Sequence, residues 1–156
     1  MPETPQQRLQ AMGLTLPAGA APFANYVPYV REGALLFIAG QAPVGADGKI
    51  AYVGRVGREL SEAEGYASAR LCGIGCLAQI RQAVGSLDRV RRIVSLRGFV
   101  NSAEDFFGQA KVINGASDLM VEVFGDLGRH VRAAVGTSVL PMNMATEIEL
   151  IASVEP

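Results

Sequence analysis

The sequence predicts an α+β domain in which two helices cover one face of a mixed or antiparallel sheet. Two observations carry this prediction. A capping-box pattern at Ser61 opens a long helical segment, and apolar and polar residues alternate in Val90–Val100 and again near the chain end. The resulting order is a strand pair, a weak strand, a helix, a strand, a helix and a second strand pair. At 156 residues the chain has the length of one domain, which we expect to span 1–156, with an N-terminal helix and arm over 1–25.

Composition excludes several classes of protein. Hydrophobic residues make up 49% of the chain and charged residues 19%, which argues against disorder. Fourteen Lys and Arg against fifteen Asp and Glu give a formal charge of −1, so no nucleic-acid partner is expected. The apolar run Gly33–Gly40 is far shorter than the ~20 residues that span a bilayer. The first residues lack the features of a signal peptide. We therefore expect a soluble, cytoplasmic protein without a membrane partner.

The N-terminal part predicts a helix, an arm and a hairpin. Residues 3–12 are compatible with a short amphipathic helix, and 14–25 contains two prolines and no regular period, as an extended arm would. A hairpin follows, with its turn at Glu32-Gly33. Its second strand contains the continuous apolar run Leu35–Ile38, which predicts burial on both faces. A weak strand is expected near 50–53.

The central part predicts two helices around a strand. Ser61 begins the first helix, which runs to about Val84 and ends at Gly85. The half-buried strand Val90–Val100 follows. The second helix is expected to begin at 102–105.

Asn114-Gly115 predicts a break in this second helix, and Ser117 is expected to cap a continuation to Gly125. Two terminal strands follow, over 131–137 and 147–154.

Arg132 and Glu147 form the chemically interesting pair. If the two terminal strands make a hairpin, these side chains share a face and come close. One interpretation is an ordinary surface ion pair, which would contribute ~0–1 kcal/mol. The other is a site in which the arginine grips a carboxylate and the glutamate handles a water or a proton. Spacing does not choose between them.

A sheet covered by helices on one face leaves its other face open. We expect that face to be covered by another subunit, because it mixes apolar and charged groups. The residues assigned to it are Arg97, Phe99, Arg132, Ala134, Glu147 and the run Leu35–Ile38.

The cysteines and the histidine give weaker signals. Cys72 and Cys76 lie four residues apart, and structural thiols are favoured over a redox or metal role because further ligands are lacking nearby. The single histidine, His130, is interpreted as a surface or packing residue. No metal site is predicted.

Three segments carry a resemblance to a known family. Gly33–Pro43 is similar to a GxLLFxSGQxP pattern, Phe99–Phe106 to FVTDLNDF, and Arg132–Glu149 to RSxVxVxxLPxxxxxEIE. On these motifs the chain resembles the RidA/YjgF family, also called endoribonuclease L-PSP-like. The segment Asn114–Gly125, followed by Arg129, resembles a longer-loop branch of it.

The resemblance implies a chorismate-mutase-like fold in which three subunits close a central barrel, with active sites at the subunit interfaces and no cofactor. The implied activity is that of an imine deaminase, a hydrolase that converts reactive 2-imino or enamine carboxylates to 2-keto acids and ammonia. The implied partners are a small 2-imino or 2-keto carboxylate and the other two subunits of a homotrimer.

The resemblance also assigns residues. Arg132 matches the arginine that grips the substrate carboxylate, and Glu147 the glutamate that positions the attacking water. The substrate-binding positions it implies are Tyr26, Ala39, Gly40, Asn114 and Ala134. Phe99 is expected in the core rather than in the pocket.

Two of these positions depart from the family pattern. Ala39 replaces the usual serine, and Ala134 a frequent cysteine. Because residue 39 lacks the hydroxyl group of the family's serine, a second class of protein stays possible, a non-catalytic protein that binds or senses a small carboxylate. A third class, a ribonuclease, is disfavoured by the charge balance and by the lack of a histidine-based acid–base pair.

Overall fold

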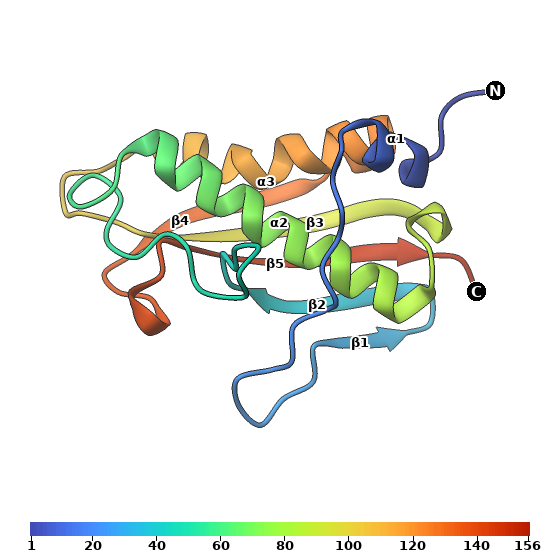
Figure 1. Ribbon diagram of the computed structural model, residues 1–156, viewed down its shortest axis with the longest axis horizontal. Helices are drawn as coiled ribbons and strands as arrows, with labels where there is room; N and C mark the ends of the chain where they lie inside the picture. Colours follow the sequence, from blue (N-terminus) through green and yellow to red (C-terminus); the bar gives the residue numbers. More distant parts are fainter.

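Five strands form one mixed sheet, and two long helices cover one of its faces (Figure 1). The computed structural model describes residues 1–156. All neighbouring strands are antiparallel except β3 and β4, which are parallel. This architecture confirms the predicted α+β fold. In their order across the sheet, the strands are β1 (Tyr29–Glu32), β2 (Leu35–Gln41), β5 (Thr146–Val154), β3 (Val90–Asn101) and β4 (Val131–Thr137).

The predicted hairpin of β1 and β2 forms, but its turn is Gly33-Ala34 rather than Glu32-Gly33, because Glu32 still pairs with Leu35; Gly33 adopts φ +60° there. The expectation that Leu35–Ile38 is buried on both faces is wrong for the protomer. Leu36 and Ile38 are buried under the helices, whereas Leu35 and Phe37 remain 39% and 40% exposed on the open face. The run is continuously apolar although only one of its faces is covered within the chain.

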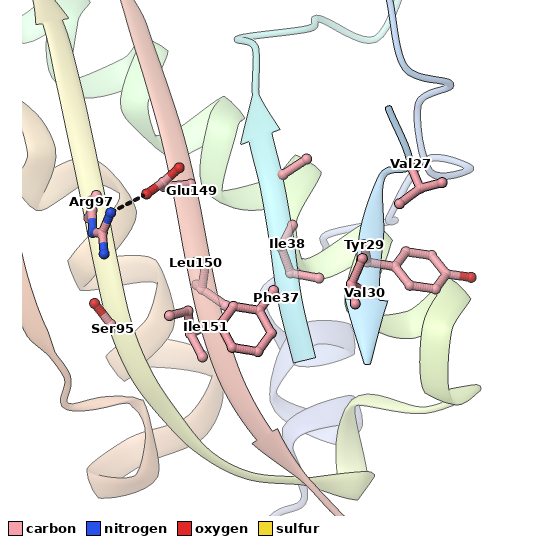
Figure 2. A pocket seen from close by; sticks show the side chains of 11 residues that line it. Val27, Tyr29, Val30, Phe37, Ile38, Ser95, Arg97, Glu149, Leu150 and Ile151 are labelled. Carbon is pink, nitrogen blue, oxygen red and sulfur yellow. Dashed lines mark ion pairs between the residues drawn. The ribbon is translucent and has the colours of Figure 1, made fainter. Parts of the chain in front are cut away.

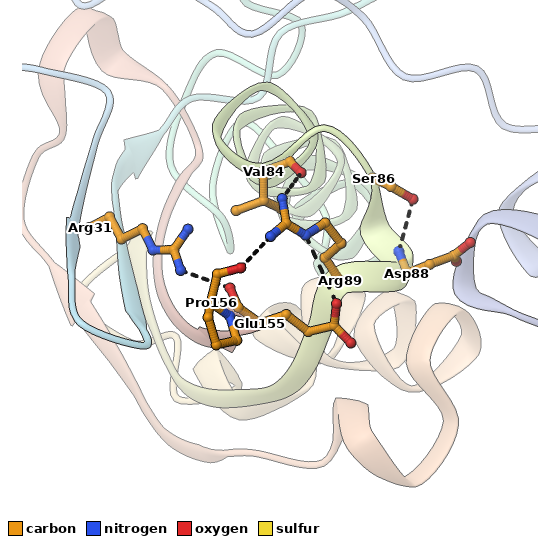
Figure 3. A network of polar contacts seen from close by, with 7 residues as sticks. All are labelled: Arg31, Val84, Ser86, Asp88, Arg89, Glu155 and Pro156. Carbon is orange, nitrogen blue, oxygen red and sulfur yellow. Dashed lines mark hydrogen bonds and ion pairs between the residues drawn. The ribbon is translucent and has the colours of Figure 1, made fainter.

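Helix α2 (Glu62–Val84) begins and ends as predicted. The Ser61 hydroxyl accepts a hydrogen bond from the Glu64 amide, and Gly85 ends the helix at φ +87°. At the end of α2, Arg89 donates to the carbonyl oxygens of Val84 and Pro156 (Figure 3). These bonds join the end of the helix to the end of the chain.

Helix α3 (Gln109–Phe124) differs from the prediction. It begins at Gln109 rather than at 102–105, because the Ser102 and Ala103 amides bond the carbonyls of Thr137 and Val56. It also passes through Gly115 without a break. A Cβ at that position would lie 2.0 Å from the Tyr66 carbonyl oxygen, so glycine serves the close crossing of α2 and α3.

Strands β4 and β5 do not form the expected hairpin. Each pairs with β3, on opposite sides of it. The connection between them contains Met142 and Asn143, both at positive φ. The crossover that the parallel pair of β3 and β4 requires is made by α3, and the later connection carries the chain from β4 past β3 to β5.

The N-terminal segment lies across the outside of the helix layer (Figure 1). Helix α1 (Pro5–Ala11) is capped by the Thr4 hydroxyl, and the arm after it is bonded to α2. Gln79 donates to the carbonyl oxygen of Ala20, and Arg81 donates to that of Pro17. The weak strand expected at 50–53 is reduced to two isolated bridges, Val44 with Ile50 and Val53 with Met144. No helix has the length and apolar character needed to cross a membrane.

Candidate functional site

The face of the sheet away from the helices, here the open face, carries a concave region of about 300 Å³ (Figure 2). Apolar side chains line most of it, and an ion pair between Arg97 and Glu149 with N···O 3.1 Å crosses it. Phe99 lies on this face beside Glu147, not in the core as expected. The large exposed apolar side chains of the open face are Val30, Leu35, Phe37, Val131 and Val135.

Glu147 lies on the open face near the end of β2. Burial raises the pKa of its half-buried carboxyl, and the nearby Glu149 raises it further. A Cβ at Gly40 would stand 2.0 Å from Glu147 Oε1, so any side chain at residue 40 would displace the carboxyl group from its place. The pairing of β2 with β5 is irregular between Ile38 and Gln41, and this bulge contains Gly40.

Tyr26 and Ala39 flank the same end of β2. Tyr26 and Gly40 line a small cavity of about 70 Å³ under the arm, and the Tyr26 hydroxyl accepts a hydrogen bond from the Phe23 amide. Ala39 lines the concave region of the open face. Gly40 therefore links the Glu147 carboxyl group on one side to Tyr26 on the other, with Ala39 next to it in β2, and we call these four residues the glutamate half-site.

Arg132 lies on the other face, at the free edge of the sheet. It pairs with the buried Leu96, and its guanidinium contacts α3. Nη1 donates to Asn114 Oδ1 at 2.7 Å and to Ser117 Oγ at 3.1 Å, and Nη2 donates to the Ala110 carbonyl at 3.2 Å. Of the five N–H groups of a guanidinium, this leaves Nε–H and one on Nη2. These two nitrogens form the planar fork that matches a carboxylate.

Asn114, Ser117, Arg132 and Ala134 make up the arginine half-site. Ala134 is opposite Gly98 in the register, on the helix-covered face with Arg132. The expectation that Arg132 and Ala134 lie on the open face is therefore wrong, because the register of β4 on β3 places Val131 and Val135 on the open face and turns Arg132 toward the helices. Arg132 and Glu147 lie on opposite faces with β3 between them, so they form no ion pair within one protomer.

Ser117 and His130 were not assigned to the site from sequence. The signal was present, since Ala110, Asn114 and Ser117 fall on one face of a helix at spacings of four and three. The predicted break at Asn114-Gly115 concealed it.

The two thiols have no role in either half-site. Cys72 and Cys76 are fully buried between α2 and β5, and desolvation raises the pKa of Cys72 to about 12. They behave as the predicted structural thiols, because the reactive form is the thiolate. No group of three or more His, Cys, Asp or Glu side chains is arranged to hold a metal.

A mixed sheet of order β1-β2-β5-β3-β4, with α2 and α3 on one face, defines the chorismate-mutase-like class of α+β folds. Residues 6–154 match the family model described as "YjgF/chorismate mutase-like, putative endoribonuclease", and the chain belongs to this family. The resemblance seen in the motifs is thereby confirmed.

Individual relatives agree with this assignment. The chain is 46% identical over 144 residues to Protein TCP17 of Trypanosoma cruzi, covering 92% of this chain and 89% of that protein. It is 44% identical to Atu1372 of Agrobacterium tumefaciens, a protein of unknown function, with a TM-score of 0.90 over 98% of this chain and 94% of that one. The structure of Escherichia coli TdcF with bound serine is 25% identical, with a TM-score of 0.63 over 91% and 97% of the two chains.

Proposed function

We propose that this protein hydrolyses reactive 2-imino and enamine carboxylates to 2-keto acids and ammonia, without a cofactor. The observation that carries the proposal is the guanidinium of Arg132. Three bonds to α3 hold it, and its Nε–H and one Nη2–H stay free. Membership of the YjgF family and the raised pKa of Glu147 support the same chemistry.

Arg132 binds the carboxylate of the substrate and orients the C=N carbon. Glu147 holds a water, whose oxygen attacks that carbon while one of its protons passes to the carboxylate. Glu147 returns that proton to the substrate nitrogen, which gives the neutral carbinolamine. The carboxylate then takes the proton of the new hydroxyl group and passes it to the same nitrogen, so that the C–N bond breaks and ammonia leaves as the C=O bond forms. A raised pKa makes the Glu147 carboxylate a better proton acceptor than an ordinary glutamate. Much of the acceleration is positional, since free imines already hydrolyse in water.

The proposed reaction needs a second protomer, because one protomer keeps the two half-sites on opposite faces. We infer a homotrimer in which the arginine half-site of one subunit meets the glutamate half-site of its neighbour. The exposed apolar side chains of the open face support this assembly, since an apolar surface of this kind is normally covered by a partner. Desolvation in the interface would strengthen the attraction between Arg132 and a bound carboxylate.

The test is release of 2-keto acid and ammonia from freshly generated 2-iminopropanoate. We expect Arg132→Ala to lower kcat/KM at least ten-fold, because the carboxylate loses a charged bidentate partner. Arg70→Ala is the matched control, since Arg70 pairs with Glu122 on the outer helix surface at 2.7 Å. Equal activity of the wild type and Arg132→Ala would refute the proposal.

A non-catalytic carboxylate-binding protein is the second candidate. Ala39 favours it, because a family hydroxyl is missing there, and TdcF was solved with bound serine, itself a carboxylate. A rise in Tm with 2-oxobutanoate, without turnover of any imine, would favour binding over catalysis.

A further inference from the structure

Two hydrogen bonds of His130 adjoin the bond between Ser117 and Arg132, and the proposed reaction does not use them. His130 Nδ1 lies 2.7 Å from the Gly128 carbonyl oxygen, and its Nε2 lies 2.9 Å from Ser117 Oγ. The same Ser117 oxygen accepts from Arg132 Nη1 at 3.1 Å. Three consecutive bonds thus connect a backbone carbonyl to the guanidinium.

The chemistry of the partners fixes the direction of every bond. A carbonyl oxygen can only accept, so His130 carries its proton on Nδ1. In the neutral ring Nε2 is then an acceptor, and Ser117 must donate to it. With its proton so directed, the Ser117 oxygen presents its lone pairs to Arg132. The neutral ring is also favoured because burial, opposed in part by the Gly128 bond, lowers the pKa of His130, and the charge of Arg132 lowers it further.

This arrangement matters because a serine within a helix has an alternative. Its hydroxyl can donate to the carbonyl four residues earlier, which here would be that of Ile113. His130 removes that alternative by accepting the proton. The Ser117 oxygen, Asn114 and the Ala110 carbonyl then hold the three N–H groups that face α3, and the Nε–Nη2 fork stays free.

We propose that Ser117 and His130 are positioning residues for Arg132, and that together they hold its free fork in the orientation that receives a carboxylate. This inference rests on the proposed role of Arg132 as the carboxylate-binding group. It goes further by assigning a task to the single histidine of the chain, which neither touches the substrate nor exchanges a proton with it.

The experiment measures KM and kcat for 2-iminopropanoate, and the Kd of 2-oxobutanoate by calorimetry. We expect Ser117→Ala to raise both KM and Kd about ten-fold, the effect of one lost bond to a charged group, with a smaller change in kcat. Ser117→Thr keeps the hydroxyl and should restore both values. Ser86→Ala is the matched control, since the Ser86 hydroxyl caps a turn in the separate network of Figure 3.

A double-mutant cycle separates positioning from general stability. If His130 acts through Ser117, then His130→Ala raises Kd in the wild type but adds nothing in the Ser117→Ala background. Both variants should also have little effect in an Arg132→Lys background. Additive effects in either background, or unchanged Kd values in folded variants, would overturn the inference.

Nitrogen NMR gives a readout that needs no substrate. Because His130 is the only histidine, its two ring nitrogens can be assigned without ambiguity, and Nδ1 is expected to carry the proton at neutral pH. The other tautomer would refute the proposed bond directions. If the wild type binds 2-oxobutanoate but hydrolyses no imine, the proposed function is refuted and the Kd measurements still test the positioning role. If it neither binds nor hydrolyses, the proposed function and the positioning role are both refuted.

Discussion

Gly40→Ala offers a direct test of how closely the Glu147 carboxyl must be placed. A Cβ at residue 40 would stand 2.0 Å from Glu147 Oε1 and 2.9 Å from its Cδ, whereas ordinary contacts begin at 3.4 Å. The carboxyl group must therefore move by roughly 1 Å, and such a displacement can cost about 100-fold in rate. Gly40 has no positive φ, so alanine brings no backbone strain. The carboxyl group is half-exposed at the end of a flexible side chain, so it can shift without unfolding the sheet.

We expect Gly40→Ala to lower kcat/KM for 2-iminobutanoate by 10- to 100-fold, with a Tm within about 2 °C of the wild type. The assay follows 2-oxobutanoate release, and a thermal melt is measured on the same sample. Gly45→Ala is the control, because the nearest atom to its Cβ would be Oδ1 of the turn residue Asp47 at 3.2 Å, and its other neighbours would lie at an ordinary 3.7 Å. A folded Gly40→Ala protein with kcat/KM within two-fold of the wild type would refute the reasoning that the position of Glu147 limits the reaction.

Three further predictions concern stability and reactivity. Gly115→Ala forces a Cβ against the Tyr66 carbonyl at 2.0 Å, so we expect a loss of about 1–3 kcal/mol and a Tm lower by several degrees; an unchanged Tm would contradict the close helix crossing. Cys72 and Cys76 should resist iodoacetamide in the native protein and react after denaturation, since burial raises both pKa values; rapid native labelling, measured by mass spectrometry, would contradict this. Burial raises the pKa of Glu147 above 4.5, so the contribution of its protonated form to stability is complete below that pH and is lost as pH rises through the folded-state pKa. Glu147→Gln should therefore raise Tm at pH 7 but not at pH 4. Equal Tm shifts at the two pH values would contradict the raised pKa.

Local signals in the sequence predicted much of the fold. The Ser61 capping box, the Gly33 turn and the alternation in β3 are each determined within a few residues, and the structure contains all three. The predicted start of α3 at 102–105 is wrong because the Ser102 and Ala103 amides donate to carbonyl oxygens of distant segments instead of starting a helix. The sequence predicts a break at Gly115, whereas the structure uses this glycine for contact with a helix about fifty residues away in sequence, a requirement that no local pattern contains.

The candidate site was predicted by residue type but not by arrangement. The motifs identify Arg132 and Glu147, yet the alternation of apolar residues is equally compatible with a hairpin and with two strands flanking β3. Pairing partners are set by the packing of the whole sheet, so the face on which Arg132 lies could be determined only from the strand order of the structure. Ser117 and His130 became visible for the same reason, since their bonds depend on the pairing of β4 with β3, which places β4 next to α3.

The separation of the two half-sites by β3 gives the proposed enzyme an unusual dependence on its own abundance. An isolated subunit would contain both half-sites but no complete active site. Dilution below the dissociation constant of the trimer would therefore abolish activity while every chain stays folded. Selection on turnover would then act on contacts between chains as strongly as on the reacting groups themselves.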